Sequence, residues 1–248
     1  MPIHDWTKVP EGLFHHFHQD WTIELARALN RGGLPEGVAA LVEQRLGPRE
    51  GDVLAIEHRA ARVGPPEMGG VATLPPPVAQ MVRRTDCGFY AERANRVVIK
   101  HHLGRMLAVI EIVSPGNKDC RASLREFVEK TADFLASGIH VLVVDLFPPT
   151  ARDPCGIHKA IWDQFIEEPF TFPHGKDRIA VSYLSGAERV AYIEPLAFGD
   201  DLPNLPLFLS SDFYVATPLE STYRTAWEFS PLALRTAVET GISPEAES

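Results

Sequence analysis

The spacing of apolar residues predicts a helix near the start of the chain and a loop further on. Over residues 11–30 apolar side chains recur at helical intervals, and Gly32-Gly33 follows the run. Residues 60–78 are rich in proline and glycine, which predicts a long loop. A short strand is expected at 52–58, before this loop. The apolar positions of the helix are Phe14, Phe17, Trp21, Leu25 and Leu29.

Two strands are expected next, at about 92–101 and 105–113, with a tight turn near Gly104. The second strand is apolar on both faces, which is typical of a strand in the middle of a sheet that is covered on both sides. An amphipathic helix follows to about residue 137, with Gly138 as its C-cap. Its inner stripe consists of Leu124, Phe127, Val128 and Leu135.

Another strand that is apolar on both faces is expected at Ile139 to Leu146, so the order is helix, three strands, helix and strand. A short helix near 157–166 and a hairpin of 179–184 with 189–196 should come after it. Thr217-Pro218-Leu219-Glu220 has the pattern of a capping box that opens a final helix toward 238. The pattern as a whole predicts an α/β fold with a mixed sheet.

Length and composition indicate one globular domain over residues 1–248. Hydrophobic residues make up 45% and charged residues 23% of the chain, which is enough apolar surface for a single core. The sequence has no secretory signal pattern and no apolar run long enough to span a membrane, so a cytoplasmic location is expected. Cys87, Cys120 and Cys155 are odd in number and form no C-x-x-C pair, which favours free thiols in a reducing compartment.

The charge pattern weighs against a long nucleic acid as partner, because the net charge is −9. Residues 92–105 are an exception. They carry Arg93, Arg96, Lys100 and Arg105 against Glu92 alone, a local net charge of +3. A solvated strand and turn explains this segment at least as well as a binding site.

Three carboxylates stand out by their positions. Glu111 lies in the middle of an apolar strand, where an ionised side chain costs several kcal/mol unless it has a partner. Asp145 ends the strand at 139–146, and Asp52 opens the strand at 52–58. Singly, each has a structural explanation: Asp52 caps a turn, Glu111 pairs with an arginine such as Arg93 or Arg105, and Asp145 accepts backbone N–H groups.

Together, in this strand order, the carboxylates favour a shared site slightly over the structural explanations. Two carboxylates on neighbouring strands followed by a lysine suit Mg²⁺ or Mn²⁺ and the hydrolysis of phosphodiesters. Three further residues follow the strand that ends at Asp145 and are candidates for lining the same site: Arg152, Asp153 and His158.

Histidines on the first helix suggest a second, weaker metal site. His15, His16 and His18 follow His4 and Asp5 closely, and such a group suits a transition metal. A polar helix face with hydrogen-bonding histidines is favoured over a metal site, because no second group of ligands accompanies them. No motif of esterases, P-loop proteins, zincins or Rossmann dinucleotide-binding proteins is present.

The chain from Met1 to about Glu239 resembles a bacterial family known as domain of unknown function 4058, which has no established activity and therefore implies fold and kinship only. The stretches that carry the resemblance are His4-Asp5-Trp6-Thr7, Phe14-His15-His16-Phe17-His18, Asp52-Val53, Val109-Ile110-Glu111-Ile112-Val113-Ser114-Pro115-Gly116-Asn117-Lys118, Asp145-Leu146-Phe147-Pro148-Pro149, Gly156-Ile157-His158-Lys159-Ala160-Ile161-Trp162 and Pro218-Leu219-Glu220.

The centre of the chain also resembles the Uma2-type endonucleases, a branch of the PD-(D/E)xK nucleases. This resemblance implies Asp52 and Glu111 as metal carboxylates, Lys130 as the lysine of the following helix, and Asp145 as the aspartate that ends the last core strand. The sequence departs from the motif at Val113, where the full nuclease motif has its lysine.

The missing lysine leaves three alternatives open: Lys130 or Lys118 takes its role, or activity has been lost. The expectation is a PD-(D/E)xK-like core over 11–146 with a C-terminal elaboration over 147–240. Its function would be divalent-metal-dependent phosphodiester hydrolysis on nucleic acid, and the alternative is a non-catalytic binding or assembly module. An oligomer stays open, and a membrane is not expected as a partner. The residues expected around the site are Asn117, Asp145, Arg152 and His158.

Overall fold

The computed structural model describes residues 3–9, 11–43, 80–85, 96–101 and 104–240. The strand expected at 52–58, the loop expected at 60–78 and the carboxylate of Asp52 lie outside these ranges.

Within the described residues, seven strands form one sheet in the order β1-β3-β4-β5-β6-β7-β2. β4 and β5 run parallel, and the other neighbouring strands run antiparallel. This confirms the mixed sheet and places the expected strands at 92–101, 105–113 and 139–146 side by side as β3, β4 and β5. The bounds are β1 Val38–Glu43, β2 Met81–Thr85, β3 Arg96–His101, β4 Met106–Ile112, β5 His140–Asp145, β6 Arg178–Leu184 and β7 Arg189–Leu196.

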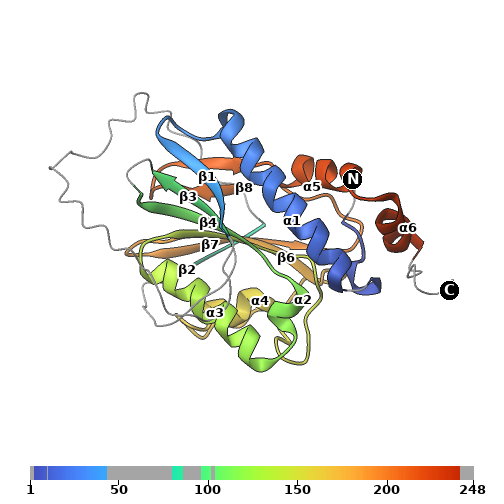
Figure 1. Ribbon diagram of the computed structural model, residues 1–248. Coiled ribbons are helices and arrows are strands. Elements are labelled where there is room, and N and C mark those ends of the chain that lie inside the picture. The colour runs from blue at the N-terminus through green and yellow to red at the C-terminus, as the bar shows by residue number, and fades with distance from the viewer. Residues whose placement is uncertain (1–2, 10, 44–79, 86–95, 102–103, 241–248) are drawn as a thin grey trace.

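Helices cover both faces of this sheet (Figure 1). On one side lies α1, whose final turn continues into a π-helical turn at Leu29–Gly33. α5 packs against α1, and α2, α3 and α4 lie on the opposite side. A separate pair of short strands completes the fold. The bounds are α1 Glu11–Ala28, α2 Pro115–Lys118, α3 Arg121–Ala136, α4 Gly156–Trp162, α5 Leu219–Phe229, α6 Leu232–Thr240, a 3-10 turn Trp6–Lys8, β8 Leu205–Phe208 and β9 Tyr214–Thr217.

The cover on both faces explains why the central strands are apolar throughout. Ile110 and Ile112 of β4 belong to the core that contains α1, whereas Val113, the residue after β4, belongs to the core that contains α3. Because successive side chains of a strand point to opposite faces, Glu111 lies on the α3 side. The buried residues of β5 divide between the two cores in the same alternating way.

The helix expected after the second core strand is present as α3, and the turn expected before it forms the short helix α2. α2 ends at Lys118, and α3 begins at Arg121 with the Cys120 thiol accepting the backbone N–H of Ser123. The predicted inner stripe of α3 is buried. Gly138 has a φ of 78°, the left-handed conformation that glycine adopts at a helix C-terminus.

The capping box predicted at Thr217-Pro218-Leu219-Glu220 is wrong. Thr217 is the last residue of β9, the N-cap of α5 is Pro218, and no side chain caps the helix. The carboxylate of Glu220 instead accepts the backbone N–H of Leu202 at 3.1 Å. The helix expected toward 238 is divided in two. α5 ends at Phe229, because Ser230 precedes a proline and adopts an extended conformation with ψ of 144°, and α6 continues from Leu232 to Thr240.

The N-terminal segment is held against α5 through the hydroxyl of Tyr223. This oxygen accepts the backbone N–H of His4 at 3.2 Å and the indole N–H of Trp6 at 3.1 Å. Its own proton is therefore left for Nδ1 of His4, which lies 2.8 Å away. The ring of His4 also stacks on Trp227 with 3.7 Å between the centroids. The His4-Asp5-Trp6 stretch thus has a structural role that joins the two ends of the described chain.

His140 gives the fold a predictable response to acid. Its Nδ1 accepts the backbone N–H of Ser185 at 3.0 Å, and burial lowers the pKa of His140 to about 4. The unfolded chain, with a pKa near 6.5, binds the proton first as the pH falls, so stability should be lost between pH 6.5 and 4. This group contributes about 3 kcal/mol to that loss. In urea titrations across this range, His140→Asn should show a shallower pH dependence than the wild type. Equal slopes would contradict the assignment.

Candidate functional site

The buried carboxylate of Glu111 is paired with a lysine from the neighbouring helix. Nζ of Lys130 on α3 lies 2.8 Å from Oε2 of Glu111, and the side chains are 2% and 1% exposed. The same ammonium lies 4.6 Å from the ring centroid of Phe127, one helical turn earlier. The sequence predicted that Glu111 must have a partner, and among the described residues this ion pair provides one. Of the two arginines considered, Arg105 is exposed and Arg93 lies outside the described residues.

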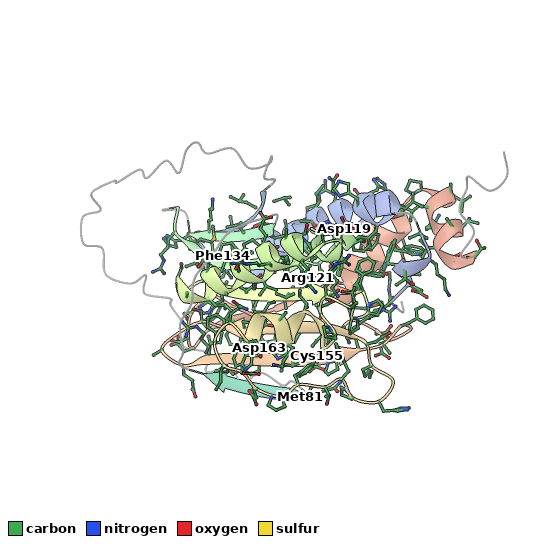
Figure 2. The ribbon with its side chains drawn as sticks, turned by 90° about the horizontal axis from the view of Figure 1, so that it is seen from below. Met81, Asp119, Arg121, Phe134, Cys155 and Asp163 are labelled. Atoms are coloured by element: carbon green, nitrogen blue, oxygen red, sulfur yellow. The ribbon has the colours of Figure 1, made fainter. Side chains whose placement is uncertain are left out.

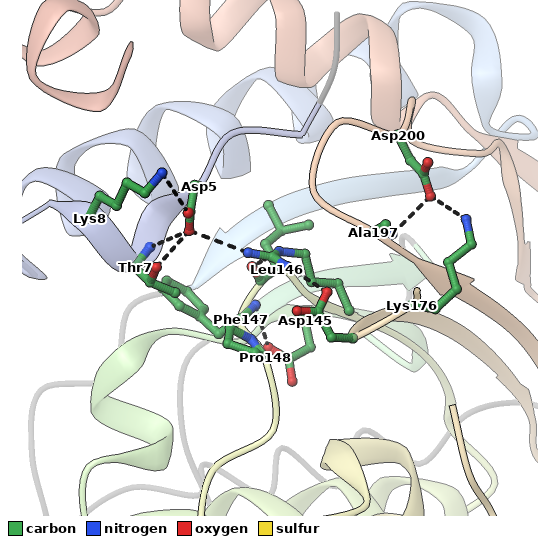
Figure 3. Close-up of polar contacts among 12 residues, drawn as sticks. Asp5, Thr7, Lys8, Asp145, Leu146, Phe147, Pro148, Lys176, Ala197 and Asp200 are labelled. Carbon is green, nitrogen blue, oxygen red and sulfur yellow. Dashed lines mark hydrogen bonds and ion pairs between the residues drawn. The ribbon is translucent and has the colours of Figure 1, made fainter. Parts of the chain in front are cut away.

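A second buried group lies at the end of β5. Nζ of Lys118, the last residue of α2, lies 2.6 Å from Oδ2 of Asp145 and 2.9 Å from Oδ2 of Asp153. The ammonium also donates to the carbonyl of Pro148 at 3.3 Å. Oδ1 of Asp145 accepts the backbone N–H of Phe147, which is the structural role considered for this residue from the sequence (Figure 3).

The two groups share one face of the sheet. β4 and β5 are parallel, and Glu111 is level with Val143. Asp145 follows Val143 by two positions and therefore points to the same side of the sheet as Glu111. α2 and α3 cover this side, so both carboxylates meet lysines there. The face thus carries two carboxylate–lysine groups near the carboxyl ends of its parallel strands.

Burial and charge act in opposite directions on the second group. Burial raises the pKa of Asp145 to about 6, although Lys118 and the Phe147 N–H oppose the shift and the nearby charge of Asp153 adds to it. For Lys118, burial alone would lower the pKa. The two carboxylates outweigh that effect, so the pKa of Lys118 is raised. Lys118 therefore stays protonated, and the charge of its ammonium is balanced by Asp145 and Asp153.

The other residues expected around the site have separate roles. Oδ1 of Asn117 accepts the backbone N–H and the hydroxyl of Ser114, which caps α2. The exposed Arg152 donates from Nη1 to the backbone carbonyl of Lys118 at 3.1 Å. Nδ1 of His158 lies 2.8 Å from the hydroxyl of Tyr183, within the aromatic packing of α4.

A pocket of about 320 Å³ opens beside Lys118, between α2, the residues after β5 and the N-terminal turn. No motif or spacing in the sequence predicts that the N-terminal turn lies here. It is fixed by Asp5, whose Oδ1 accepts the N–H and the hydroxyl of Thr7 and pairs with Arg178 at 3.4 Å (Figure 3). Arg178 also donates to the carbonyl of Leu146. The pocket is lined by Thr7, Pro115, Lys118, Asp119, Phe147, Pro148, Pro149 and Thr150.

The histidines of α1 contact residues of their own helix. Nε2 of His15 is 2.9 Å from the side-chain amide of Gln19, and Nε2 of His16 is 3.5 Å from Asp20. His18 stacks on Phe14. Across the described ranges, no three or more His, Cys, Asp or Glu side chains are grouped as ligands of one metal ion.

Comparison with family models finds no match for the chain, and neither do comparisons with curated proteins and with solved structures. None of the helices in the described part of the chain is long and apolar enough to cross a membrane.

Proposed function

We propose that this chain is a nuclease-like protein that hydrolyses phosphodiester bonds with the help of Mg²⁺ or Mn²⁺. The observation that supports this function is the contact of 2.8 Å between Lys130 and Glu111, at the carboxyl end of a parallel strand pair. A carboxylate beside an ammonium is the combination that this reaction requires, because the carboxylate binds the cation and the ammonium stabilises the negative charge that develops on the phosphate.

The donor chemistry fits such a cation in part. Mg²⁺ prefers oxygen ligands and uses one or two carboxylates together with water. Glu111 fits as one ligand by its chemistry, since it is a carboxylate whose Oε2 is fixed in place by Lys130. The second carboxylate in the proposal is Asp52, which lies outside the described residues. When bound, the cation would supply an acidified water and neutralise charge on the phosphate.

Lys130 is assigned the role of charge stabiliser in preference to Lys118. Lys118 is held between Asp145 and Asp153, and its charge is balanced by two carboxylates rather than directed at Glu111. Lys130 would stay fixed by its contact with Glu111 and by packing over Phe127. The helix lysine thereby replaces the strand lysine that Val113 cannot supply.

Burial favours a second candidate function. With Glu111 and Lys130 only 1% and 2% exposed, the pair is closed in this structure, which suits a binding or assembly module that has kept an ion pair in its core. A closed pair of opposite charges is also stable without a metal, provided that both partners stay in place.

Cleavage and metal binding separate the two functions. Purified protein is incubated with single- and double-stranded DNA and RNA in Mn²⁺, and Mn²⁺ binding is measured by calorimetry. The nuclease proposal predicts that Glu111→Gln and Asp52→Asn lower metal affinity, and that Lys130→Gln keeps Mn²⁺ binding but slows cleavage about 100-fold or more. The exposed Arg27→Gln variant is the control and should match the wild type. Absence of both cleavage and Mn²⁺ binding would favour the binding module.

A further inference from the structure

The outer surface of α3 and α4 carries a groove that is separate from the buried lysine groups. Its volume is about 520 Å³, and it runs between α3, the loop that follows β5 and the end of α4. Figure 2 labels Arg121 at the start of α3 and Asp163 at the end of α4 on this side of the molecule. The groove is lined by Arg121, Leu124, Arg125, Val128, Glu129, Ala151, Arg152, Ala160, Asp163 and Gln164.

Three arginines dominate the charge of this groove. Arg121, Arg125 and Arg152 are all exposed. The two carboxylates of the lining are already engaged, Glu129 with Arg125 and Asp163 with Lys159. Within the described ranges, neither Arg121 nor Arg152 is ion-paired with a carboxylate. The three arginines and two carboxylates of the lining thus leave a net charge of +1, carried by Arg121 and Arg152, on a chain whose net charge is −9.

The position of Arg121 is locally unfavourable. Arg121 is the first residue of α3 and Arg125 lies one turn later, and the first turn of this helix holds no acidic residue. A cation at a helix N-terminus is repelled by the helix dipole, so Arg121 would gain from a bound anion, whereas Arg125 lies beyond the first turn and pairs with Glu129. Arg152 is held in place by its bond to the carbonyl of Lys118. The rim is thus partly ordered before any ligand arrives.

We propose that this groove binds an acidic peptide segment of a partner protein. Arginine presents a planar fork that matches a carboxylate with two hydrogen bonds, which suits glutamate and aspartate side chains. Leu124 and Val128 are only 7% and 5% exposed and form the floor of the groove, where with the half-buried Ala160 they present a small apolar surface to a peptide. A nucleic acid backbone has no such side chains, and its dense charge would be repelled more strongly by a chain of net charge −9.

The proposal is tested by fluorescence anisotropy with a short fluorescein-labelled peptide of alternating glutamate and leucine residues. The wild type should bind it, and binding should weaken as salt is raised. The triple variant Arg121→Gln, Arg125→Gln, Arg152→Gln should bind at least about tenfold more weakly. The matched control is Arg27→Gln, Arg31→Gln, Arg224→Gln, which removes the same charge elsewhere and should bind like the wild type. Circular dichroism checks that both variants are folded, and Arg121→Gln alone replaces the triple variant if the latter is not.

Several outcomes would overturn the proposal. They are no binding of the peptide by the wild type, equal loss of binding in both triple variants, and equal affinity for a peptide in which glutamine replaces glutamate. Single-stranded DNA of matching length is measured in parallel. If DNA binds through the three arginines and the peptide does not, the groove is a nucleic-acid site and the peptide proposal fails. The result does not depend on whether Glu111 and Lys130 support hydrolysis.

Discussion

Replacing Lys130 by methionine is expected to lower the free energy of unfolding by about 3–5 kcal/mol. The substitution keeps the length and most of the apolar contacts of the side chain, including those to Phe127, but removes the ammonium 2.8 Å from Glu111. A carboxylate that is 1% exposed then loses this partner and cannot recover its hydration. Urea denaturation followed by circular dichroism measures the change.

The double variant Glu111→Leu, Lys130→Met is the control for this prediction. It removes both charges and replaces them with apolar groups of similar size, so most of the lost stability should return. If the double variant is as unstable as Lys130→Met, the loss comes from packing and not from the buried charge. A loss below about 1 kcal/mol in the single variant would show that other contacts of Glu111 carry its charge.

Lys118→Met is expected to destabilise the protein by a similar amount, about 3–5 kcal/mol at neutral pH. It removes the cation that lies 2.6 Å from Asp145 and 2.9 Å from Asp153, both of which are buried. The loss also releases the bond from Lys118 to the carbonyl of Pro148, which holds the residues after β5. Thermal unfolding and urea denaturation at pH 7.5 provide the measurement.

The same variant should become relatively more stable in acid. Burial already raises the pKa of Asp145 to about 6, above its unfolded value of 3.8, and removal of Lys118 should raise it further. A carboxyl with a raised folded pKa binds protons more strongly in the folded state, so its unfavourable contribution is greatest above the folded pKa and fades as the pH falls toward 3.8. The difference between Lys118→Met and wild type should therefore shrink between pH 7 and pH 4.

Arg27→Met provides the matched control. Arg27 is 60% exposed in its ion pair with Glu24, so losing one positive charge there should change stability by no more than about 0.5 kcal/mol at either pH. A pH-independent defect in Lys118→Met would contradict the assignment of its cost to the two aspartates.

The periodicity of apolar residues was sufficient to predict the central strands and helices. β4 and β5 are apolar on both faces because helices cover both sides, and α1 and α3 bury the stripes that their spacing predicts. The apolar pattern of such an element reflects which of its faces are buried, so the element can be predicted from its own residues. β1 was not predicted, because Leu41 and Val42 are adjacent apolar residues and both are exposed. No alternation of buried and exposed positions marks this strand.

For the candidate site, the sequence could predict only that Glu111 requires a charged or hydrogen-bonding partner. Glu111 in an apolar strand needs a partner on energetic grounds, and the motif resemblance made Lys130 a candidate from the following helix. Distances between side chains do not follow from sequence spacing, so the roles of Lys130 and Lys118 stayed open. The structure separates them, since Lys130 contacts Glu111 and Lys118 contacts Asp145 and Asp153. The place of Asp52 relative to Glu111 remains a prediction.

Two features depended entirely on long-range packing. The N-terminal turn reaches the residues after β5 through Asp5 and Arg178, which are 173 positions apart in the chain. The groove combines the first turns of α3 with Arg152 and the end of α4. The sequence by itself determined which segments are buried and which charges need partners, because the free energy of burial depends on the local composition and on the periodicity of apolar residues. Only the tertiary structure decided which partners those charges meet, because that depends on how the helices cross the sheet.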